Sequence, residues 1–172
     1  MSIEKVRAEF ERLGIAERML EFSVSSATVE LAAKALGTEG ARIAKTLSFH
    51  SGNGGCMLVV TAGDTKIDNG KFKARFGVKA KMLSPDEALA MTGHAVGGVC
   101  PFALPEGVEV YLDVSMRRFP TVFPAVGSAS SAIELTCEEL ARYSGGEWVD
   151  VCKPASRVGG SITGRAARQA CV

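Results

Sequence analysis

Apolar residues spaced three and four apart predict helices in the first part of the chain. They recur at helical spacing from Ile3 to Leu13, and Gly14 follows, which indicates a short amphipathic helix with a defined end. A second helix is expected from about Thr28 to Leu36, capped by Ser26 and ended by Gly37. These patterns place two short helices before residue 40.

Two later helices carry stronger start signals. The segments SPDE (84–87) and TCEE (136–139) both fit the capping box, in which a Ser or Thr and a Glu three residues later satisfy backbone amides reciprocally. The first also has Pro85 at its opening helical position, where proline is favoured. Helices are therefore expected to begin after Ser84 and after Thr136.

Between these helices the pattern changes to short alternating or β-branched runs bounded by glycine, proline or asparagine, which is typical of strands. The Asn-Gly pair in SGNGG (51–55) predicts a hairpin between the first two runs. Helices and strands alternate without a repeat, so we expect an α/β single domain with a mixed, strongly curved, barrel-like sheet and helices packed outside. The predicted strands are IAKTLSFH (43–50), CMLVVT (56–61), VKAKML (78–83), VEVYLD (108–113), TVFPAV (121–126), SAIEL (131–135) and EWVDV (147–151).

Composition narrows the class of protein. The chain has 172 residues, 47% hydrophobic and 23% charged, which suits one domain with a sizeable core. The first 14 residues mix charges among the apolar ones, so they predict neither a secretory signal nor a membrane span, and we expect a cytoplasmic protein without a membrane partner. Five cysteines at wide spacing, without a CxxC pair and with only two histidines, predict reduced thiols, no metal site and no cofactor.

Charge is unevenly distributed, although the net charge is only +1 and predicts no long DNA footprint. Residues 66–81 hold several basic side chains against the single acid Asp68, either as a solvated helix face or as a phosphate-contacting patch. Residues 153–172 hold four basic residues and no acid, and predict a basic tail, flexible or of cloning origin, after a domain at 1–152. The basic residues of the patch are Lys66, Lys71, Lys73, Arg75, Lys79 and Lys81.

A lysine interrupts the apolar face of the strand at 43–50. Side chains alternate along a strand, so Lys45 shares its face with Ile43, Leu47 and Phe49. An unpaired buried ammonium is costly, so this lysine must pair, extend to solvent at the strand end, or line a cavity. In a cavity its charge and donors would hold a carbonyl oxygen or a phosphate.

The segment TGHAVGGVCP (92–101) is neither helix nor strand by its pattern. Gly97 and Gly98 permit backbone conformations closed to other residues and let a ligand approach the amides, which can bind an oxyanion. Pro101 biases Cys100 towards an extended conformation and stiffens the end of the loop. The same composition also suits a plain connection after a helix ending at Gly93.

Common catalytic motifs do not account for the sequence. No GxSxG elbow, GxGxxG fingerprint or P-loop occurs, which disfavours serine hydrolase, dinucleotide-binding and ATP-binding classes. Cys100 with His94 as its base would form a nucleophilic pair, but their spacing within one loop does not establish a contact.

From about residue 20 to 152 the chain resembles the YbaK family of aminoacyl-tRNA deacylases, which is related to the inserted editing domain of bacterial prolyl-tRNA synthetase. The resemblance rests on Lys45 in RIAKTLSF, LVVTAGDTKID, the GGVCP loop (97–101), YLDVS and AVGSASSAIELT, in the family's order. It implies a YbaK-like fold and trans-editing, the hydrolysis of the ester between a wrong small amino acid, such as cysteine or alanine, and tRNA(Pro).

The resemblance also implies site residues and partners. Lys45 would place the substrate, and the loop from Gly97 to Pro101 would hold the aminoacyl carbonyl and the terminal ribose. In this family the substrate assists through a ribose hydroxyl or its own thiol. The acceptor end of misacylated tRNA would be the partner, with prolyl-tRNA synthetase as a further one. Expected pocket residues are Thr46, His94, Val99, Cys100, Pro101, Asp113, Gly127 and Ser128, and expected tRNA contacts are Lys71, Lys73, Arg75, Lys79 and Lys81.

Two other functions fit the same residues. A non-catalytic module of this fold would bind a tRNA, a synthetase or a small ligand, although such a module could lose Lys45 or the glycine loop without losing its core. A small-molecule esterase or thioesterase would hydrolyse simple aminoacyl esters without tRNA. The pattern alone leaves both open.

Overall fold

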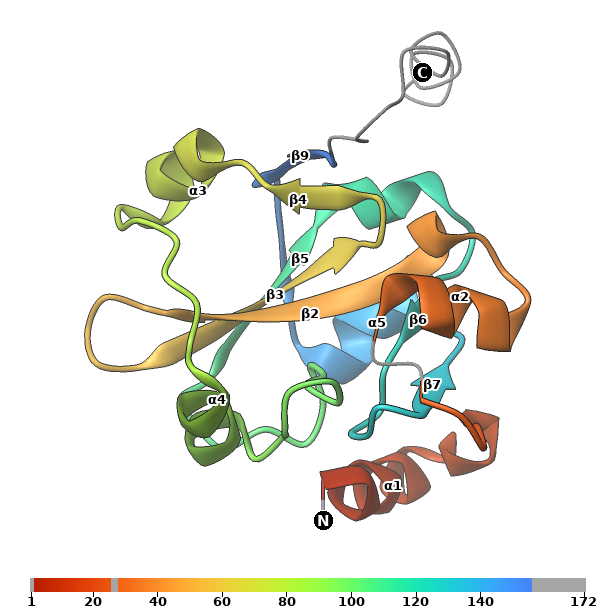
Figure 1. Ribbon diagram of the computed structural model, residues 1–172. Helices are drawn as coiled ribbons and strands as arrows, with labels where there is room; N and C mark the ends of the chain where they lie inside the picture. Colours follow the sequence, from red (N-terminus) through yellow and green to blue (C-terminus); the bar gives the residue numbers. More distant parts are fainter. Residues whose placement is uncertain (1, 26–27, 156–172) are drawn as a thin grey trace, which may run out of the picture.

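A curled five-stranded sheet runs through the molecule, with strand order β6-β2-β3-β5-β8 (Figure 1). The structure is a computed structural model that describes residues 2–25 and 28–155. The long strands β2 (Ile43–His50) and β3 (Cys56–Ala62) pair antiparallel through the predicted hairpin at 51–55. The sheet forms a half-barrel, and the predicted mixed, strongly curved α/β domain is confirmed.

The outer strands of this sheet are parallel to their neighbours. β5 (Glu109–Asp113) pairs with β3, and β8 (Glu147–Val149) pairs with β5. On the other side, the two-residue strand β6 (Phe123–Pro124) pairs with the start of β2. The sequence predicted a strand in each of these regions, although β6 is much shorter than the run at 121–126.

Two short strand pairs lie outside the main sheet. β1 (Met19–Glu21) pairs with β7 (Ser131–Ile133), and β4 (Thr65–Ile67) pairs with β9 (Cys152–Pro154), both antiparallel. The sequence indicated only the β7 region, because three-residue strands have too few positions to show an alternation. The predicted domain boundary at 152 falls inside β9, and the rest of the predicted tail, 156–172, lies outside the described residues.

The predicted helices are present with their start and stop signals. Both capping boxes form, and Gly37 ends α2 in the left-handed conformation. The cap of α2 is Thr28, whose hydroxyl accepts from the Leu31 amide; Ser26, the predicted cap, lies outside the described residues. The described α-helices are α1 (Ser2–Leu13), α2 (Val29–Leu36), α3 (Asn69–Phe76), α4 (Pro85–Thr92) and α5 (Cys137–Ser144), with 3-10 turns at Ala16–Arg18, Gly40–Arg42 and Val114–Arg118.

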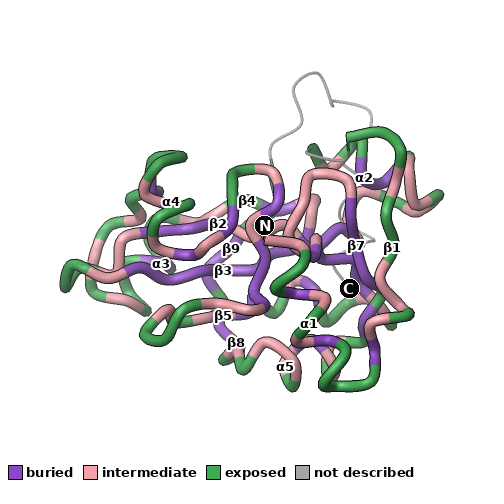
Figure 2. Tube along the Cα trace, turned by 90° about the horizontal axis from the view of Figure 1, so that it is seen from below, coloured by how far each residue is buried: buried purple, intermediate pink, exposed green. Residues whose placement is uncertain are grey.

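The core occupies both faces of β2 and β3; β3 is buried along its whole length and β2 in part (Figure 2). One face packs Ala44 and Val60 against Phe10 of α1 and against Phe102. The opposite face packs Phe49 and Val59 against α3. Because all of β3 is buried, its sequence is a nearly continuous apolar run and shows no alternation.

The predicted strand at 78–83 is not a strand in the structure. Its Met82 forms only an isolated bridge with Phe49, Lys81 O accepts from the His50 amide, and the Leu83 amide donates to Ser48 O. Ser84 then caps α4 and turns the chain away, so the pairing cannot extend further along β2.

Candidate active site

The outer edge of β2 is paired at both ends and open in the middle. β6 pairs with Ile43 and Ala44, and the 81–83 segment pairs from Ser48 to His50. Since alternate residues of a strand point their amide and carbonyl groups to the same side, Thr46 faces the interval between these two partners. Among the described residues no strand pairs with it there.

Thr46 adds a second unsatisfied group to this opening. Its hydroxyl is buried and has no hydrogen-bond partner within residues 2–25 and 28–155. Leaving such a group unpaired costs about 1–3 kcal/mol, so a water or a ligand is expected to supply the partner here, as at the equally unpaired buried hydroxyl of Thr61. The expected pocket residue Thr46 therefore lies at an opening in the sheet edge.

Lys45, the neighbour of Thr46, is half-buried on the opposite face of β2. Its ammonium donates a hydrogen bond to Thr65 O at the start of β4. Burial lowers the lysine pKa, an effect that the nearby Cys152, Asp64 and Glu30 oppose. The lysine is thus paired with a backbone carbonyl, and it lies on the side of the sheet that carries β4 and β9.

The glycine loop packs backbone to backbone against the turn at 127–128. A Cβ on Gly98 would lie 2.8 Å from the Cα and the amide nitrogen of Ser128, a separation that real Cβ atoms do not adopt. Gly97 has a φ of +96°, a conformation that other residues rarely take. Two segments that the sequence placed in the site separately, the loop and the Gly127–Ser128 turn, are therefore in contact.

This turn connects the loop to the open edge of β2. β6 runs parallel to β2 only as far as Pro124, after which the chain leaves the sheet and reaches Gly127. Val126 on the way packs in the same buried cluster as Ala44 and Cys100. The loop, the turn and the unpaired stretch of β2 thus border one region of the molecule.

The amides of the loop are not all available to a ligand. The Gly98 amide donates to Ala95 O in a tight turn. The amides of Gly97, Val99 and Cys100 have no partner within the described part of the chain. If the loop binds an oxyanion, its donors come from these three groups.

His94 and Cys100 lie behind the loop rather than on its exposed side. Both side chains have no solvent exposure. The Nε2 atom of His94 donates to Phe102 O at 2.8 Å, and burial lowers the histidine pKa despite this bond. The Cys100 thiol lies 3.5 Å from that nitrogen, and burial raises the thiol pKa to about 12. A neutral, enclosed thiol beside an N–H donor does not form an activated nucleophile.

Asp113 has a structural role. Its buried carboxylate accepts from the Ser115 and Val151 amides, both at 2.9 Å, and so caps the 3-10 turn and fixes the chain before β9. Burial, followed by the charge of Asp113, raises the pKa of the adjacent Cys152 thiol to about 12. The Asp113 carboxylate therefore holds the chain that leads into β9, near the face of β2 that carries Lys45.

The basic patch on α3 and the segment after it is partly neutralised. All five residues expected to contact tRNA are exposed. Lys71 pairs with Asp150 at 3.1 Å, and Arg75 pairs with Glu147 at 3.1 Å while its guanidinium covers the Phe76 ring. The remaining members, Lys73, Lys79 and Lys81, form no ion pair among the described residues.

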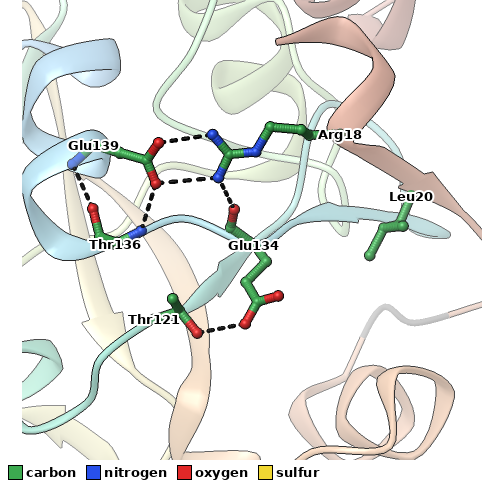
Figure 3. Close-up of a pocket in the computed structure, with 6 residues that line it drawn as sticks. All are labelled: Arg18, Leu20, Thr121, Glu134, Thr136 and Glu139. Atoms are coloured by element: carbon green, nitrogen blue, oxygen red, sulfur yellow. Dashed lines mark hydrogen bonds and ion pairs between the residues drawn. The ribbon is translucent and has the colours of Figure 1, made fainter.

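A separate hollow of about 390 Å³, which the sequence did not indicate, lies at Arg18, Leu20, Thr121, Glu134, Thr136 and Glu139 (Figure 3). The two terminal guanidinium nitrogens of Arg18 donate to the carboxylate of Glu139 at 2.7 and 3.1 Å. This pairing is the main reason that the Glu139 pKa is lowered to about 2. Glu134 accepts from the Thr121 hydroxyl at 2.6 Å. Because these charges satisfy one another, the hollow offers less to a ligand than the open edge of β2.

No cluster of three or more metal-ligating side chains occurs in the described part of the chain. Its helices also include none that is long and apolar enough to cross a bilayer. The free loop amides and the Thr46 hydroxyl border one region, whereas Lys45 lies on the opposite face of β2.

Two sequence comparisons match most of the chain. The family model of the aminoacyl-tRNA editing domain matches residues 24–143. The uncharacterized protein YwhH of Bacillus subtilis strain 168 is 54% identical over 154 residues, which are 89% of this chain and 98% of YwhH.

Two solved structures extend the comparison to the fold. A proposed trans-editing enzyme for prolyl-tRNA synthetase superposes with a TM-score of 0.80 at 29% identity, covering 88% of this chain and 97% of that one. The hypothetical protein APE2540 superposes with a TM-score of 0.75 at 28% identity, covering 84% and 99%. The YbaK-like fold expected from the sequence is confirmed.

Proposed function

Because the chain belongs to the family of aminoacyl-tRNA editing domains, we propose that it is a trans-editing hydrolase that removes a small non-cognate amino acid, cysteine or alanine, from tRNA(Pro). Membership of the family supports a tRNA editing role, and the neighbour described as a trans-editing enzyme for prolyl-tRNA synthetase supports the choice of tRNA. The bond broken is the ester between the amino acid and the 3′-terminal adenosine.

The observation that carries this proposal is the opening at Thr46. An interrupted strand edge with an unpartnered hydroxyl, bordered by a glycine loop, presents several polar groups to a small ligand. The end of a tRNA acceptor strand carries the ester, a ribose hydroxyl and an amino group that these protein groups can bind.

The reaction requires positioning more than acid-base chemistry. An aminoacyl ester is already activated, so a held water or a substrate hydroxyl can attack it once donors face the oxygen that becomes negative. The free amides of Gly97, Val99 and Cys100 would supply those donors. Cys100 takes no part as a nucleophile, since its thiol is enclosed and its pKa is raised to about 12.

Lys45 would act from the opposite face of β2, next to Thr46 in the strand. Its ammonium is held by Thr65 O, so it is oriented before substrate arrives, and a lysine has two further N–H donors to offer. Because burial lowers the lysine pKa, a negative charge on the substrate would favour the protonated form that binds it. We assign it the role of placing the substrate through its polar groups.

The partner is the acceptor end of tRNA, and prolyl-tRNA synthetase is the synthetase that would act beside this protein. Lys73, Lys79 and Lys81 have no competing ion pair among the described residues, so they can contact phosphates. Editing of freshly charged tRNA places the proposed activity in the cytoplasm.

The test is deacylation of tRNA charged with cysteine, alanine, serine, threonine or proline, by wild type and by Lys45→Ala at equal folded concentration. Lysine-dependent loss of one or two misacylated species, with prolyl-tRNA(Pro) spared, is the expected result. No turnover across the panel with tRNA binding retained would favour a binding module. Equal turnover by both proteins would contradict the role of Lys45. Turnover of simple aminoacyl esters without tRNA would indicate a general esterase.

A further inference from the structure

Helix α1 holds the glycine loop from outside the region that matches the editing-domain family. That match begins at residue 24, whereas α1 ends at Leu13. Phe10 of α1 packs edge-on against Phe102, with ring centroids 4.9 Å apart. Glu9 of the same helix accepts from the Ala103 amide at 3.0 Å. The end of the loop is thus fixed to α1 by an apolar contact and a hydrogen bond.

The beginning of the loop is held by His94. Its ring spans the loop, because its Nε2 atom donates to Phe102 O, eight residues further along the chain. Its own amide donates to the Thr92 hydroxyl at 3.1 Å, which ties it to the end of α4. One buried side chain therefore closes the segment that contains Gly97 and Gly98.

Ser2 connects this histidine to the turn on which the loop packs. Its hydroxyl oxygen lies 2.5 Å from His94 Nδ1 and 2.7 Å from Gly127 O. The approach of the helix start to the turn is close, since a Cβ on Gly127 would lie 2.8 Å from the Ile3 amide nitrogen. Loop and turn, which meet at Gly98 and Ser128, are thus also joined through Ser2.

We propose that Ser2 and His94 are positioning residues, which set the placement of the glycine loop against the Gly127–Ser128 turn and thereby the geometry of the amides that hold the aminoacyl carbonyl. Neither side chain touches the substrate. The inference rests on the proposed function for its effect on catalysis, while the contact itself is independent of it.

The hydrogen bonds among Ser2, His94 and Gly127 can be arranged in two ways, depending on whether His94 is neutral or protonated. The bond to Phe102 O requires a proton on Nε2, and the Ser2 hydroxyl has a single proton to donate. With neutral His94, Ser2 donates either to Nδ1 or to Gly127 O; both contacts are complete only when Nδ1 is also protonated.

The groups around the ring determine which form is favoured. Burial and the charge of Lys5 on α1 disfavour the protonated ring, while the bond to Phe102 O favours it. Glu9 on the same helix and the neutral Cys100 thiol from the loop are the other titratable groups near it. Positioning of the loop is therefore expected to depend on the protonation of His94.

The experiment compares Ser2→Ala, Ser2→Thr and His94→Gln with wild type, each checked for folding by thermal unfolding. Removing the Ser2 hydroxyl is expected to lower kcat for the misacylated tRNA roughly tenfold with KM within about twofold, because a displaced amide weakens transition-state contacts more than binding. Threonine, which keeps the hydroxyl, is expected to restore most of kcat. In His94→Gln the pH dependence of kcat below about pH 6.5 should flatten, because burial lowers the His94 pKa from that value.

Matched controls are Ser51→Ala, which removes a hydroxyl from the distant β2–β3 hairpin, and His50→Gln, which removes the chain's other histidine. Neither is expected to change kcat or its pH profile. Full activity and an unchanged pH profile in both Ser2→Ala and His94→Gln would overturn the assignment.

Hydrogen exchange of the amides at 95–100 gives a readout that needs no turnover. Ser2→Ala is expected to speed their exchange, and the Ser51→Ala control is not. Unchanged exchange would overturn the inference even in an active enzyme. An inactive wild type with faster loop exchange in Ser2→Ala would instead count against the proposed function and leave the contact supported.

Discussion

Gly98 and Ser128 meet so closely that a Cβ on the glycine would lie 2.8 Å from the Ser128 Cα. The contact joins two segments thirty residues apart in the chain and leaves no room for a side chain between their backbones. It makes the position of the glycine loop depend on the position of the turn that follows β6.

Replacing Gly98 by alanine should therefore displace the loop. We expect Gly98→Ala to lower the free energy of unfolding by about 1–3 kcal/mol, since backbone atoms cannot move aside as a flexible side chain can, and to reduce deacylation. Urea unfolding and kcat/KM would measure the two effects. Gly70→Ala, on the exposed side of α3, is the matched control and should leave both nearly unchanged. A fully active and stable Gly98→Ala would show that the loop does not need this contact.

Lys45 should be required for turnover but not for folding. Lys45→Met keeps the length of the side chain and removes its donors, so we expect kcat/KM to fall by about a hundredfold. The cost to folding should stay near 1 kcal/mol, because one hydrogen bond to Thr65 O is lost. Lys34→Met on the exposed face of α2 is the control. Retained activity in Lys45→Met would remove the lysine from the site.

The basic patch should divide into two functional groups. Neutralising Lys73 and Lys79 with glutamine is expected to weaken tRNA binding and to reduce the dependence of log Kd on log salt by about 1.5, close to one counterion per lysine. Neutralising Lys71 and Arg75 should change tRNA binding less, because Asp150 and Glu147 already pair with them. Filter binding over a salt series measures both. Equal losses in the two double variants would contradict this division.

Stability should depend on pH through His94. Burial lowers its pKa in the folded protein below the unfolded value of about 6.5, so the unfolded chain binds the proton more readily. The free energy of unfolding is therefore expected to be highest above pH 6.5 and to fall as the pH decreases through the folded pKa. Denaturant unfolding between pH 5.5 and pH 8 would measure it. His94→Gln should remove most of the slope and His50→Gln should not; a slope that survives in His94→Gln would assign it to other groups.

The thiols of Cys100 and Cys152 should not react in the folded protein. Burial raises the pKa of Cys100 and of Cys152 to about 12, so neither holds thiolate at neutral pH. We expect iodoacetamide to leave both unmodified under native conditions, by mass spectrometry after digestion, and to leave deacylation unaffected. Denatured protein, in which both should react, is the control. Rapid modification of Cys100 with loss of activity would instead support Cys100 as a catalytic nucleophile.

Local signals in the sequence determined most of the secondary structure. The capping boxes at Ser84 and Thr136 and the stop at Gly37 act within one helical turn, so they could be identified without knowing the fold. The apolar runs gave β2 and β3 for the same reason. The run at 78–83 misled because its residues suit a strand, whereas the cap at Ser84 ends its pairing with β2 after one bridge.

The candidate site could be predicted only as a set of residues. Resemblance to a family identified Lys45, the glycine loop and the Gly127–Ser128 turn, but no pattern showed that the loop and the turn touch. Asp113 shows the difference: the resemblance implied a pocket residue, and in the fold both its oxygens accept from backbone amides. Tertiary partners, which lie far away in the chain, decide whether a polar side chain is free to bind.

The sequence by itself determined the helices, the long hairpin and the residue types available for chemistry, because these depend on neighbours within a few positions. Only the tertiary structure decided that Lys45 is held by Thr65 O, that Thr46 faces an unpaired strand edge, and that Ser2 reaches His94 across 92 positions of sequence. Such contacts form when the packed core brings distant backbone segments within hydrogen-bonding range, and the order of the residues carries no local signal of them.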